Sequence, residues 1–362
     1  MNKTHATPEN ASERAHRAIS ELIQRRPLGA NTTESLFDDL LSGRLDDAQI
    51  GAVLALIQAK GVDADELLGA ARVMRRHVTT VPFQPNDSEA LIDTCGTGGA
   101  AKTFNISTAA ALVAASVTPP TASGLSRVVV AKHGNRSRTG RGSAEALAAL
   151  GVNIDATPNV QALCLREVGV CFCFAIRHHP AMKHAAGPRA SLGSPTVFNL
   201  LGPLTNPAGA GRQVIGVYRP EFVGLVAHAL AGLGATSALV AHSDDGMDEL
   251  STAAINRVAW VRDGQVHEET VDGRSFGLEA ARPEDLRASD LKHAASLVKA
   301  SLDGSSTTHR DVVVLNAAAA LVVAGAVSHL DEGVELAKEA IKSGKAYRLL
   351  ERLAVVSQGG GG

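Results

Sequence analysis

Short apolar runs alternate with longer helical stretches beyond residue 88, and this alternation constrains the fold more than any other feature. Turn formers bound the runs, as they bound buried strands; the runs are Val128–Ala131, Val170–Ala175, Val214–Val217 and Ala238–Ala241. Asn316–Val327 has the pattern of an apolar helix and Leu330–Ser343 that of an amphipathic one. Parallel strands need a crossover connection, usually a helix. We therefore expect an α/β domain with a mostly parallel central sheet.

The first part of the chain has a purely helical pattern. Apolar residues recur at three-to-four spacings over Ala11–Val81. The segment Asn31–Glu34 offers an N-cap for one helix, and Gly61 lies between two others. Two prolines and several turn formers follow in Val81–Ser88. We expect a helical domain over residues 1–85, an α/β domain over 86–176 and 199–357, and a flexible tail over 358–362.

Composition excludes several classes of protein. The 362 residues are 45% hydrophobic, enough for a large core, and the formal charge of −2 argues against a nucleic-acid-binding surface. The opening residues contain no apolar segment, so we expect no secretory signal. No stretch approaches the roughly 20 apolar residues of a membrane-spanning helix. The four cysteines form no disulfide framework and are expected to be small buried hydrophobes. We expect a cytoplasmic protein that binds neither membrane nor nucleic acid.

A glycine turn lies between a strand and a helix in DTCGTGGAAKTFNIST (Asp93–Thr108). Glycines let backbone N–H groups approach an anion, and a helix N-terminus favours negative charge there. The pattern is neither the Walker motif nor the dinucleotide G-x-G-x-x-G. A tight connection without a ligand is the alternative. The hydroxyl and amide side chains at the helix entrance favour phosphate binding.

Two further charged segments follow predicted strands. A loop with Lys132, Arg136, Arg138 and Arg141 combines cations with glycines, which suits the binding of a polyphosphate. A solvated basic loop is the alternative. The acidic segment Asp244–Glu249 suits magnesium, which prefers oxygen ligands, although an acidic turn is the simpler reading. In open α/β sheets such strand-end loops meet in one crevice.

Three histidines near a fourth strand end, His178, His179 and His184, have no helical spacing with a nearby acid that would indicate zinc. Arg189 follows them in sequence. Its guanidinium suits an anionic substrate.

These motifs, in this order, resemble those of the anthranilate phosphoribosyltransferase family over roughly Ile19 to Leu353. The motifs are GTGG with TFNIST (Gly96–Thr108), VAKHGNRS (Val130–Ser137), HHPAMKH (His178–His184), FNLLGPLTNP (Phe198–Pro207) and DDGMDELS (Asp244–Ser251). The resemblance implies a homodimer in which residues 177–198 rejoin the helical domain. It also implies Mg²⁺-assisted transfer of phosphoribose from 5-phosphoribosyl 1-pyrophosphate to the amine of anthranilate, with release of pyrophosphate.

The resemblance implies three groups of site residues. The donor would be bound by Gly96, Gly99, Thr103, Asn105, Ser107, Thr108, Lys132, His133, Gly134 and Ser143. Anthranilate would be bound by Gly96, Asn135 and Arg189, with Arg189 pairing with the carboxylate. Magnesium would be held by Ser107, Asp248 and Glu249.

The sequence departs from the family pattern at several places. Ala100 and Ala101 follow GTGG where the family has Asp-Gly, and Ile176-Arg177 replaces Pro-Asn. The other departures are a shorter and more basic loop at Arg138–Gly142, an apparent insertion at Thr118–Arg127, and Ala254-Ile255 in place of Gly-Pro. They leave open a related transferase or pyrimidine nucleoside phosphorylase with another aromatic acceptor, or a non-catalytic nucleic-acid-binding paralogue.

Overall fold

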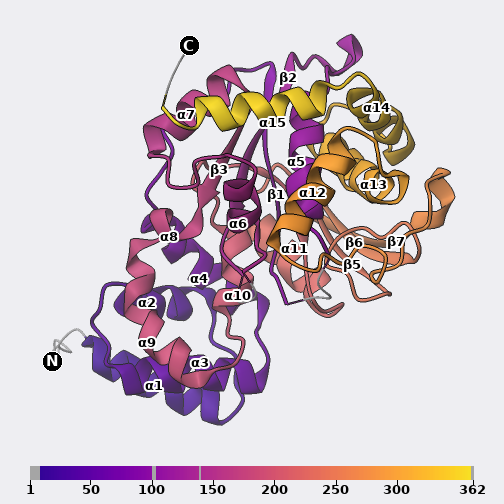
Figure 1. The fold of residues 1–362 in the computed structure, drawn as a ribbon. Coiled ribbons are helices and arrows are strands. Elements are labelled where there is room, and N and C mark those ends of the chain that lie inside the picture. Colours follow the sequence, from indigo (N-terminus) through magenta and orange to yellow (C-terminus); the bar gives the residue numbers. More distant parts are fainter. Residues whose placement is uncertain (1–8, 100–102, 138–139, 360–362) are drawn as a thin grey trace, which may run out of the picture. The chain divides into compact units, whose positions relative to one another are not determined.

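The computed structural model describes residues 9–99, 103–137 and 140–359 (Figure 1). The chain forms two compact units. The smaller consists of the described residues up to Val78 together with His179–Thr205, and the larger of Thr79–His178 and the described residues from Asn206 onward.

The boundaries of the units differ by a few residues from the predicted 85, 177 and 198. Thr79 N–H donates to the His178 carbonyl at 2.8 Å, and Val81 N–H donates to the Pro207 carbonyl at 3.0 Å. These bonds join the segment after Val78 to the larger unit. In the smaller unit the ring of Phe198 lies 5.7 Å from that of Phe37, so the chain beyond Phe198 still belongs to the helical core.

The smaller unit is entirely helical in the described residues. Its elements are α1 (Ala11–Ile23), α2 (Ala30–Leu41), α3 (Asp47–Lys60), α4 (Ala64–Arg76), η2 (Pro180–Met182), α9 (Lys183–Leu192), α10 (Phe198–Leu201) and η3 (Gly202–Leu204). Asp46 and Asp63 cap α3 and α4, accepting hydrogen bonds from the Gln49 and Asp65 N–H groups.

The predicted N-cap within Asn31–Glu34 was wrong. Helix α2 starts at Ala30 with Gly29 as its N-cap, because the Gly29 carbonyl accepts from Thr33 N–H at 3.0 Å. Thr33 is fully buried within the first turn. The helix therefore begins two residues earlier than an N-cap at Asn31 would start it, and its first turn places Thr33 in the core.

Seven strands of the described larger unit form one sheet in the order β3-β2-β1-β4-β5-β6-β7. The strands are β1 (Glu89–Gly96), β2 (Arg127–Gly134), β3 (Val170–Phe174), β4 (Arg212–Gly216), β5 (Ser237–Ser243), β6 (Ile255–Arg262) and β7 (Gln265–Asp272). Strands β1 to β5 pair in parallel, which confirms the predicted mostly parallel sheet.

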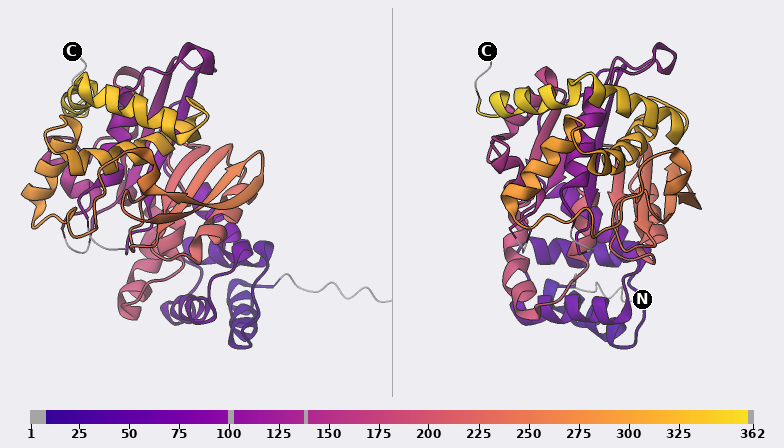
Figure 2. Two further views of the ribbon diagram at one scale, coloured as in Figure 1. Left: turned by 90° about the vertical axis from the view of Figure 1, so that its right-hand side faces the viewer. Right: turned by 45° about the vertical axis from the view of Figure 1, so that its right-hand side comes forward.

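Helices connect and cover these strands. They are α5 (Ile106–Ser116), α6 (Ser143–Ala149), α7 (Pro158–Glu167), α8 (Ala175–His178), α11 (Phe222–Gly232), α12 (Leu291–Leu302), α13 (Thr307–Ala324), α14 (Leu330–Lys342) and α15 (Lys345–Val356), with short turns η1 (Thr121–Ser123) and η4 (Gly273–Phe276). Helices α5 and α13 pack against each other and against β1, while α14 packs on α13 and α15 on α5 (Figure 2).

The β6–β7 hairpin was not predicted. Its two-residue turn is Asp263-Gly264, with φ of 50° and 73°. Asp-Gly tolerates the left-handed conformation that such a hairpin turn requires. Strand β7 carries mostly exposed side chains, so the apolar signal of a strand is absent there.

No helix in the described ranges is long and apolar enough to span a lipid bilayer. Cys95, Cys164, Cys171 and Cys173 are all buried free thiols, as predicted. Burial raises the pKa of Cys164 to about 11.

Candidate active site

Three of the predicted segments meet at one edge of the sheet. Strands β1 and β2 are neighbours and end at Gly96 and Gly134, and β5 ends at Ser243 on the far side of β4. Because these strands are parallel, the segments that follow them emerge at the same edge. The glycine turn, the basic loop and the acidic segment therefore converge in the larger unit.

The glycine turn lies against the acidic segment. A Cβ atom on Gly96 would lie 3.0 Å from Asp248 Oδ2, and one on Gly99 would lie 3.3 Å from the Tyr218 ring. Gly99 also has φ of 104°, which only glycine adopts readily. The turn thus needs glycine both for close approach and for backbone conformation. Ala100 and Ala101 lie outside the described residues.

Polar atoms without partners gather at the start of α5. Asn105 occupies the N-cap position but does not cap the helix, and its Nδ2 donates to the Arg141 carbonyl at 3.2 Å. Asn105 Oδ1 and Thr108 Oγ1 are buried and have no hydrogen-bond partner within the described residues. The Thr103 hydroxyl donates to the Phe104 carbonyl at 3.1 Å. Buried polar atoms are seldom left unpaired, so those of Asn105 and Thr108 point to a ligand.

Lys132 lies buried in β2 beside α5. Its Nζ donates to the Thr94 carbonyl at 2.6 Å and to Ser107 Oγ at 3.2 Å. Burial lowers the pKa of Lys132, and the charge of Asp93 opposes this. Asp93 is itself buried, and its Oδ1 accepts from His133 N–H at 3.0 Å. Asp93, which sequence reasoning missed, thus orients the Lys132–His133 segment.

The end of β2 packs against the start of α6. A Cβ atom on Gly134 would lie 2.3 Å from Ser143 Oγ, so glycine is needed there. Ser143 is the first residue of α6, and its hydroxyl faces the Asn135 carbonyl at 3.5 Å. Asn135 is exposed at this edge. The three residues are adjacent at this edge of the sheet.

The described arginines of the basic loop have protein partners rather than an open binding surface. Arg136 lies over the Phe174 ring at 5.6 Å, and Arg141 donates to the Ala288 carbonyl. Arg138 lies outside the described residues. Four cations were predicted to balance phosphate charge. Among those that the structure describes, Lys132 lies beside the glycine turn.

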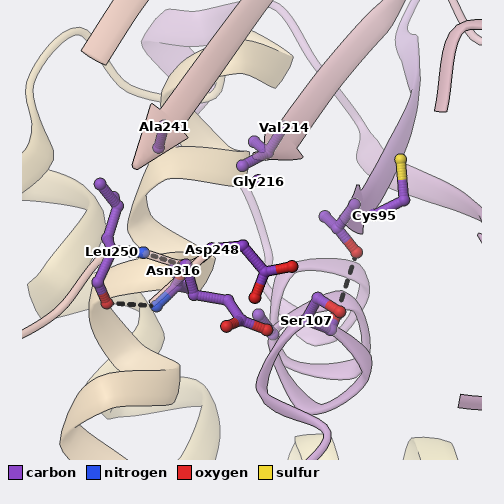
Figure 3. Close-up of a pocket in the computed structure, with 11 residues that line it drawn as sticks. Cys95, Ser107, Val214, Gly216, Ala241, Asp248, Leu250 and Asn316 are labelled. Carbon is purple, nitrogen blue, oxygen red and sulfur yellow. Dashed lines mark hydrogen bonds between the residues drawn. The ribbon is translucent and has the colours of Figure 1, made fainter. Parts of the chain in front are cut away.

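Asp248, Glu249 and Ser107, the predicted magnesium ligands, line one small cavity (Figure 3). We call Asp248 and Glu249 the acidic pair and this space the acidic cavity. Its volume is about 20 Å³, room for a water-sized particle. The remaining lining residues are Thr94, Cys95, Ala110, Val214, Gly216, Ala241, Leu250 and Asn316.

Two buried carboxyl groups lie next to each other in the acidic cavity, and ionising both there is costly without a cation. Burial raises the pKa of Asp248 and of Glu249, and the charge of Asp248 raises the pKa of Glu249 further while Lys132 opposes it. Glu249 Oε2 is buried and has no partner in the described part of the chain. No group of three His, Cys, Asp or Glu side chains in the described ranges could enclose a metal. Magnesium fits such a site because it keeps waters and substrate phosphates in its shell.

The two other aspartates of the acidic segment have structural roles. Asp244 pairs with Arg257 at 2.7 Å, and Asp245 Oδ2 accepts from the Ser251 hydroxyl at 2.6 Å. Of the four acidic side chains, only the acidic pair lines the cavity.

The histidine segment divides between the two units. His178 Nδ1 lies 2.6 Å from the Thr79 carbonyl in the larger unit, and Arg177 pairs with Asp155 at 2.8 Å. In the smaller unit the Arg189 guanidinium lies 5.1 Å from the centre of the Phe198 ring. Burial lowers the pKa of Arg189, and no ion pair with it occurs among the described residues.

Two models of known protein families match this chain, each mainly within one of its two units. Residues 88–347 match the model described as "Glycosyl transferase family, a/b domain", and residues 16–78 match "Glycosyl transferase family, helical bundle domain". The chain is 45% identical to the anthranilate phosphoribosyltransferase of Methylobacterium nodulans, over 94% of this chain and 97% of that protein. It is 43% identical to that of Desulfosudis oleivorans, over 95% and 98%.

Solved structures are similar in fold. The anthranilate phosphoribosyltransferase of Thermus thermophilus superposes with a TM-score of 0.85 at 38% identity, covering 94% of this chain and 99% of that one. The Saccharomyces cerevisiae enzyme, solved in complex with PRPP and Mg, gives 0.83 at 24% identity over 95% and 98%, which shows the shared fold.

Proposed function

We propose that this chain, which belongs to the anthranilate phosphoribosyltransferase family of glycosyl transferases, transfers phosphoribose from 5-phosphoribosyl 1-pyrophosphate to the amine of anthranilate. The observation that carries the proposal is the acidic pair beside the glycine turn, with an unpartnered Glu249 oxygen in the acidic cavity. This reaction belongs to tryptophan biosynthesis.

Departure of pyrophosphate leaves positive character at C1 of the sugar and negative charge on the leaving group. The residues must therefore stabilise the pyrophosphate more than they must attack the sugar, because a neutral arylamine is already a nucleophile. Asp248, Glu249 and the Ser107 hydroxyl would hold Mg²⁺, which supplies positive charge at the pyrophosphate when bound. Lys132 adds a cation next to Ser107.

We assign the donor to the residues around the glycine turn and the end of β2. Backbone N–H groups of the turn and of the α5 N-terminus would bind phosphate oxygens. The unpartnered Asn105 Oδ1 and Thr108 Oγ1 support this assignment. The proposed donor residues are Gly96, Gly99, Thr103, Asn105, Ser107, Thr108, Lys132, His133, Gly134 and Ser143.

From the family resemblance, we propose that Gly96, Asn135 and Arg189 bind the acceptor. An arginine that is half-buried and without an ion pair in the described ranges can bind a carboxylate through two parallel hydrogen bonds. We also propose, from the family, that the protein is a cytoplasmic homodimer.

The proposal is tested by following anthranilate fluorescence with the donor and Mg²⁺, beside a panel of other aromatic acids. Asp248→Asn and Glu249→Gln should each lower turnover at low Mg²⁺ by about a hundredfold, the usual loss for a group that stabilises transition-state charge. Asp244→Asn is the matched control, because Asp244 lies on the same loop but pairs with Arg257.

Two outcomes would contradict the proposal. Turnover of another aromatic acid in preference to anthranilate would reassign the acceptor. Wild-type rates in both acidic-pair variants across a Mg²⁺ titration would remove the metal assignment.

A further inference from the structure

One polar residue interrupts the apolar core of helix α13. Residues Val312 to Ala324 are otherwise valine, leucine and alanine, and Asn316 is only 5% exposed. Burying an amide is costly unless it is hydrogen-bonded. Packing of the helix alone would be served by an apolar residue at this position. The role of Asn316 is therefore to be found in its hydrogen-bond partners.

Asn316 binds the backbone of a single residue next to the acidic pair. Its Oδ1 accepts from Leu250 N–H at 3.0 Å, and its Nδ2 donates to the Leu250 carbonyl at 2.9 Å (Figure 3). Nδ2 also donates to the Val312 carbonyl at 2.8 Å, which ties the amide to its own helix. Leu250 directly follows Glu249, and Asn316 lines the acidic cavity.

A second asparagine binds the next residue in the same way. Asn256 Oδ1 accepts from Ser251 N–H at 2.7 Å, and its Nδ2 donates to the Ser251 carbonyl at 3.0 Å. Nδ2 also donates to the Val271 carbonyl of β7 at 3.1 Å. Asn256 is fully buried in β6. Leu250 and Ser251 are consecutive, and each has its N–H and carbonyl paired with the side chain of one asparagine. One asparagine lies on α13 and the other on β6.

The loop between β5 and β6 lacks sheet pairing in this part. The ladder ends where Ser243 pairs with Asn256. Bonds from Ser243 N–H to the Met247 carbonyl (3.0 Å) and from Gly246 N–H to the Ser243 carbonyl (2.9 Å) fix the half before the acidic pair. The asparagines fix the half after it. Loss of these bonds would remove the restraint on the backbone that directly follows the two buried carboxylates.

We propose that Asn316 and Asn256 are positioning residues for the acidic pair. They hold the backbone of Leu250 and Ser251 so that both carboxylates stay directed at the acidic cavity before a cation is bound. This inference rests on the proposed function, in which the acidic pair holds Mg²⁺. It adds that the cation-binding geometry is built in advance by neutral side chains, which act through the backbone of Leu250 and Ser251.

The test compares Asn316→Leu with Gln161→Leu. Both variants replace a buried amide side chain that binds the backbone of the larger unit. Gln161 lies on α7, and its Nε2 donates to the Ala156 carbonyl at 3.2 Å. Gln161 does not line the acidic cavity. The general effect of losing a buried amide should therefore occur in both variants. An effect on the acidic pair should occur only in Asn316→Leu.

The first measurement is hydrogen exchange in metal-free protein. In Asn316→Leu the Leu250 amide should exchange about tenfold faster, since one hydrogen bond is lost. Gln161→Leu should leave this amide at the wild-type rate. If Asn316→Leu does not fold, Asn316→Ser and Asn256→Ser provide the same comparison with a polar side chain retained. Unchanged exchange of the Leu250 and Ser251 amides in folded variants would overturn the proposal.

The second measurement is the Mg²⁺ dependence, read both from the binding of Mg²⁺ with pyrophosphate by calorimetry and from turnover. Asn316→Leu should raise the Mg²⁺ concentration for half-saturation about tenfold and recover most of its turnover at high Mg²⁺. Asp248→Asn is the reference. If Asp248→Asn alone shifts the Mg²⁺ dependence, the positioning role is wrong and the metal assignment stands. If neither shifts it, the metal assignment of the proposed function fails, and this inference fails with it.

Discussion

Replacing Arg189 by lysine should weaken the binding of anthranilate while leaving the binding of the donor nearly unchanged. The guanidinium lies 5.1 Å from the centre of the Phe198 ring, which holds it by a cation–π contact. Burial lowers its pKa, and no described acidic side chain forms an ion pair with it. A substrate carboxylate would therefore supply the partner that Arg189 lacks within the described protein.

The size of the effect follows from the contacts that lysine loses. Arginine can make two parallel hydrogen bonds to a carboxylate, whereas lysine keeps one. A hydrogen bond to a charged group contributes roughly 1.5–3 kcal/mol, and the cation–π contact about 0.5–1 kcal/mol more. The loss of about 2–4 kcal/mol corresponds to an increase in the KM for anthranilate of roughly 30- to 900-fold.

The assay measures KM for anthranilate and for the donor by the loss of anthranilate fluorescence. Anthranilamide, which lacks the negative charge, is the matched substrate. Arg189→Lys should change its KM by less than about fivefold, because anthranilamide has no carboxylate to accept two parallel bonds from arginine. Arg177→Asn is the matched variant, since Arg177 already pairs with Asp155 at 2.8 Å. It should retain wild-type kinetics.

The reasoning would be refuted if Arg189→Lys raised the KM of the donor instead. Equal effects on anthranilate and anthranilamide would also refute it, because the charge of the carboxylate would then be irrelevant. In either case Arg189 would not be the carboxylate anchor.

Three further predictions concern stability, reactivity and assembly. Burial raises the pKa of Asp39, but hydrogen bonds from Arg14 and Arg44 outweigh it and leave the pKa below its usual value. The stabilisation is therefore present above the unfolded-state pKa of about 4 and is lost as the pH falls through the folded-state pKa. Asp39→Asn should lower the unfolding free energy by about 2 kcal/mol at pH 7, and by progressively less as the pH falls below about 4, measured by urea denaturation. The buried thiols, including Cys164 with its pKa raised to about 11, should resist iodoacetamide at pH 8 until the protein is unfolded, and rapid labelling of native protein would contradict this. Light scattering at micromolar concentration should give the mass of a dimer, and a monomer would remove the proposed assembly.

Much of the fold follows from local pattern, and the part that does not has a clear physical reason. Strands β1 to β5 are nearly all buried, so their apolar runs stand out in the sequence. Strand β7 is mostly exposed, and its residues read as polar loop. Asp263-Gly264 was the signal that could have indicated the hairpin.

The candidate site divides in the same way. The acidic pair could be singled out because carboxylates at a strand end indicate their own chemistry, whereas Ser107 was grouped with it through the family resemblance. Asn316 could not, because its partner Leu250 lies 66 residues away and is bound through backbone atoms that every residue has. A single asparagine in an apolar helix was the available signal. The roles of Arg136 and Arg141 were likewise set by tertiary partners, an aromatic ring and a carbonyl.

The exposed side chains of β7 bear on how the protein avoids self-association through its sheet. As the last strand of the described sheet, β7 presents backbone N–H and carbonyl groups on one side, where none of the described strands pairs with it. Such an edge can template another chain unless charges interrupt it. Glu268 and Glu269 are exposed, and as consecutive residues they point to opposite faces of the sheet. A second copy that added its β7 to this edge would bring like charges together on both faces. The polar residues that made β7 hard to predict from the sequence therefore also protect the sheet from aggregation.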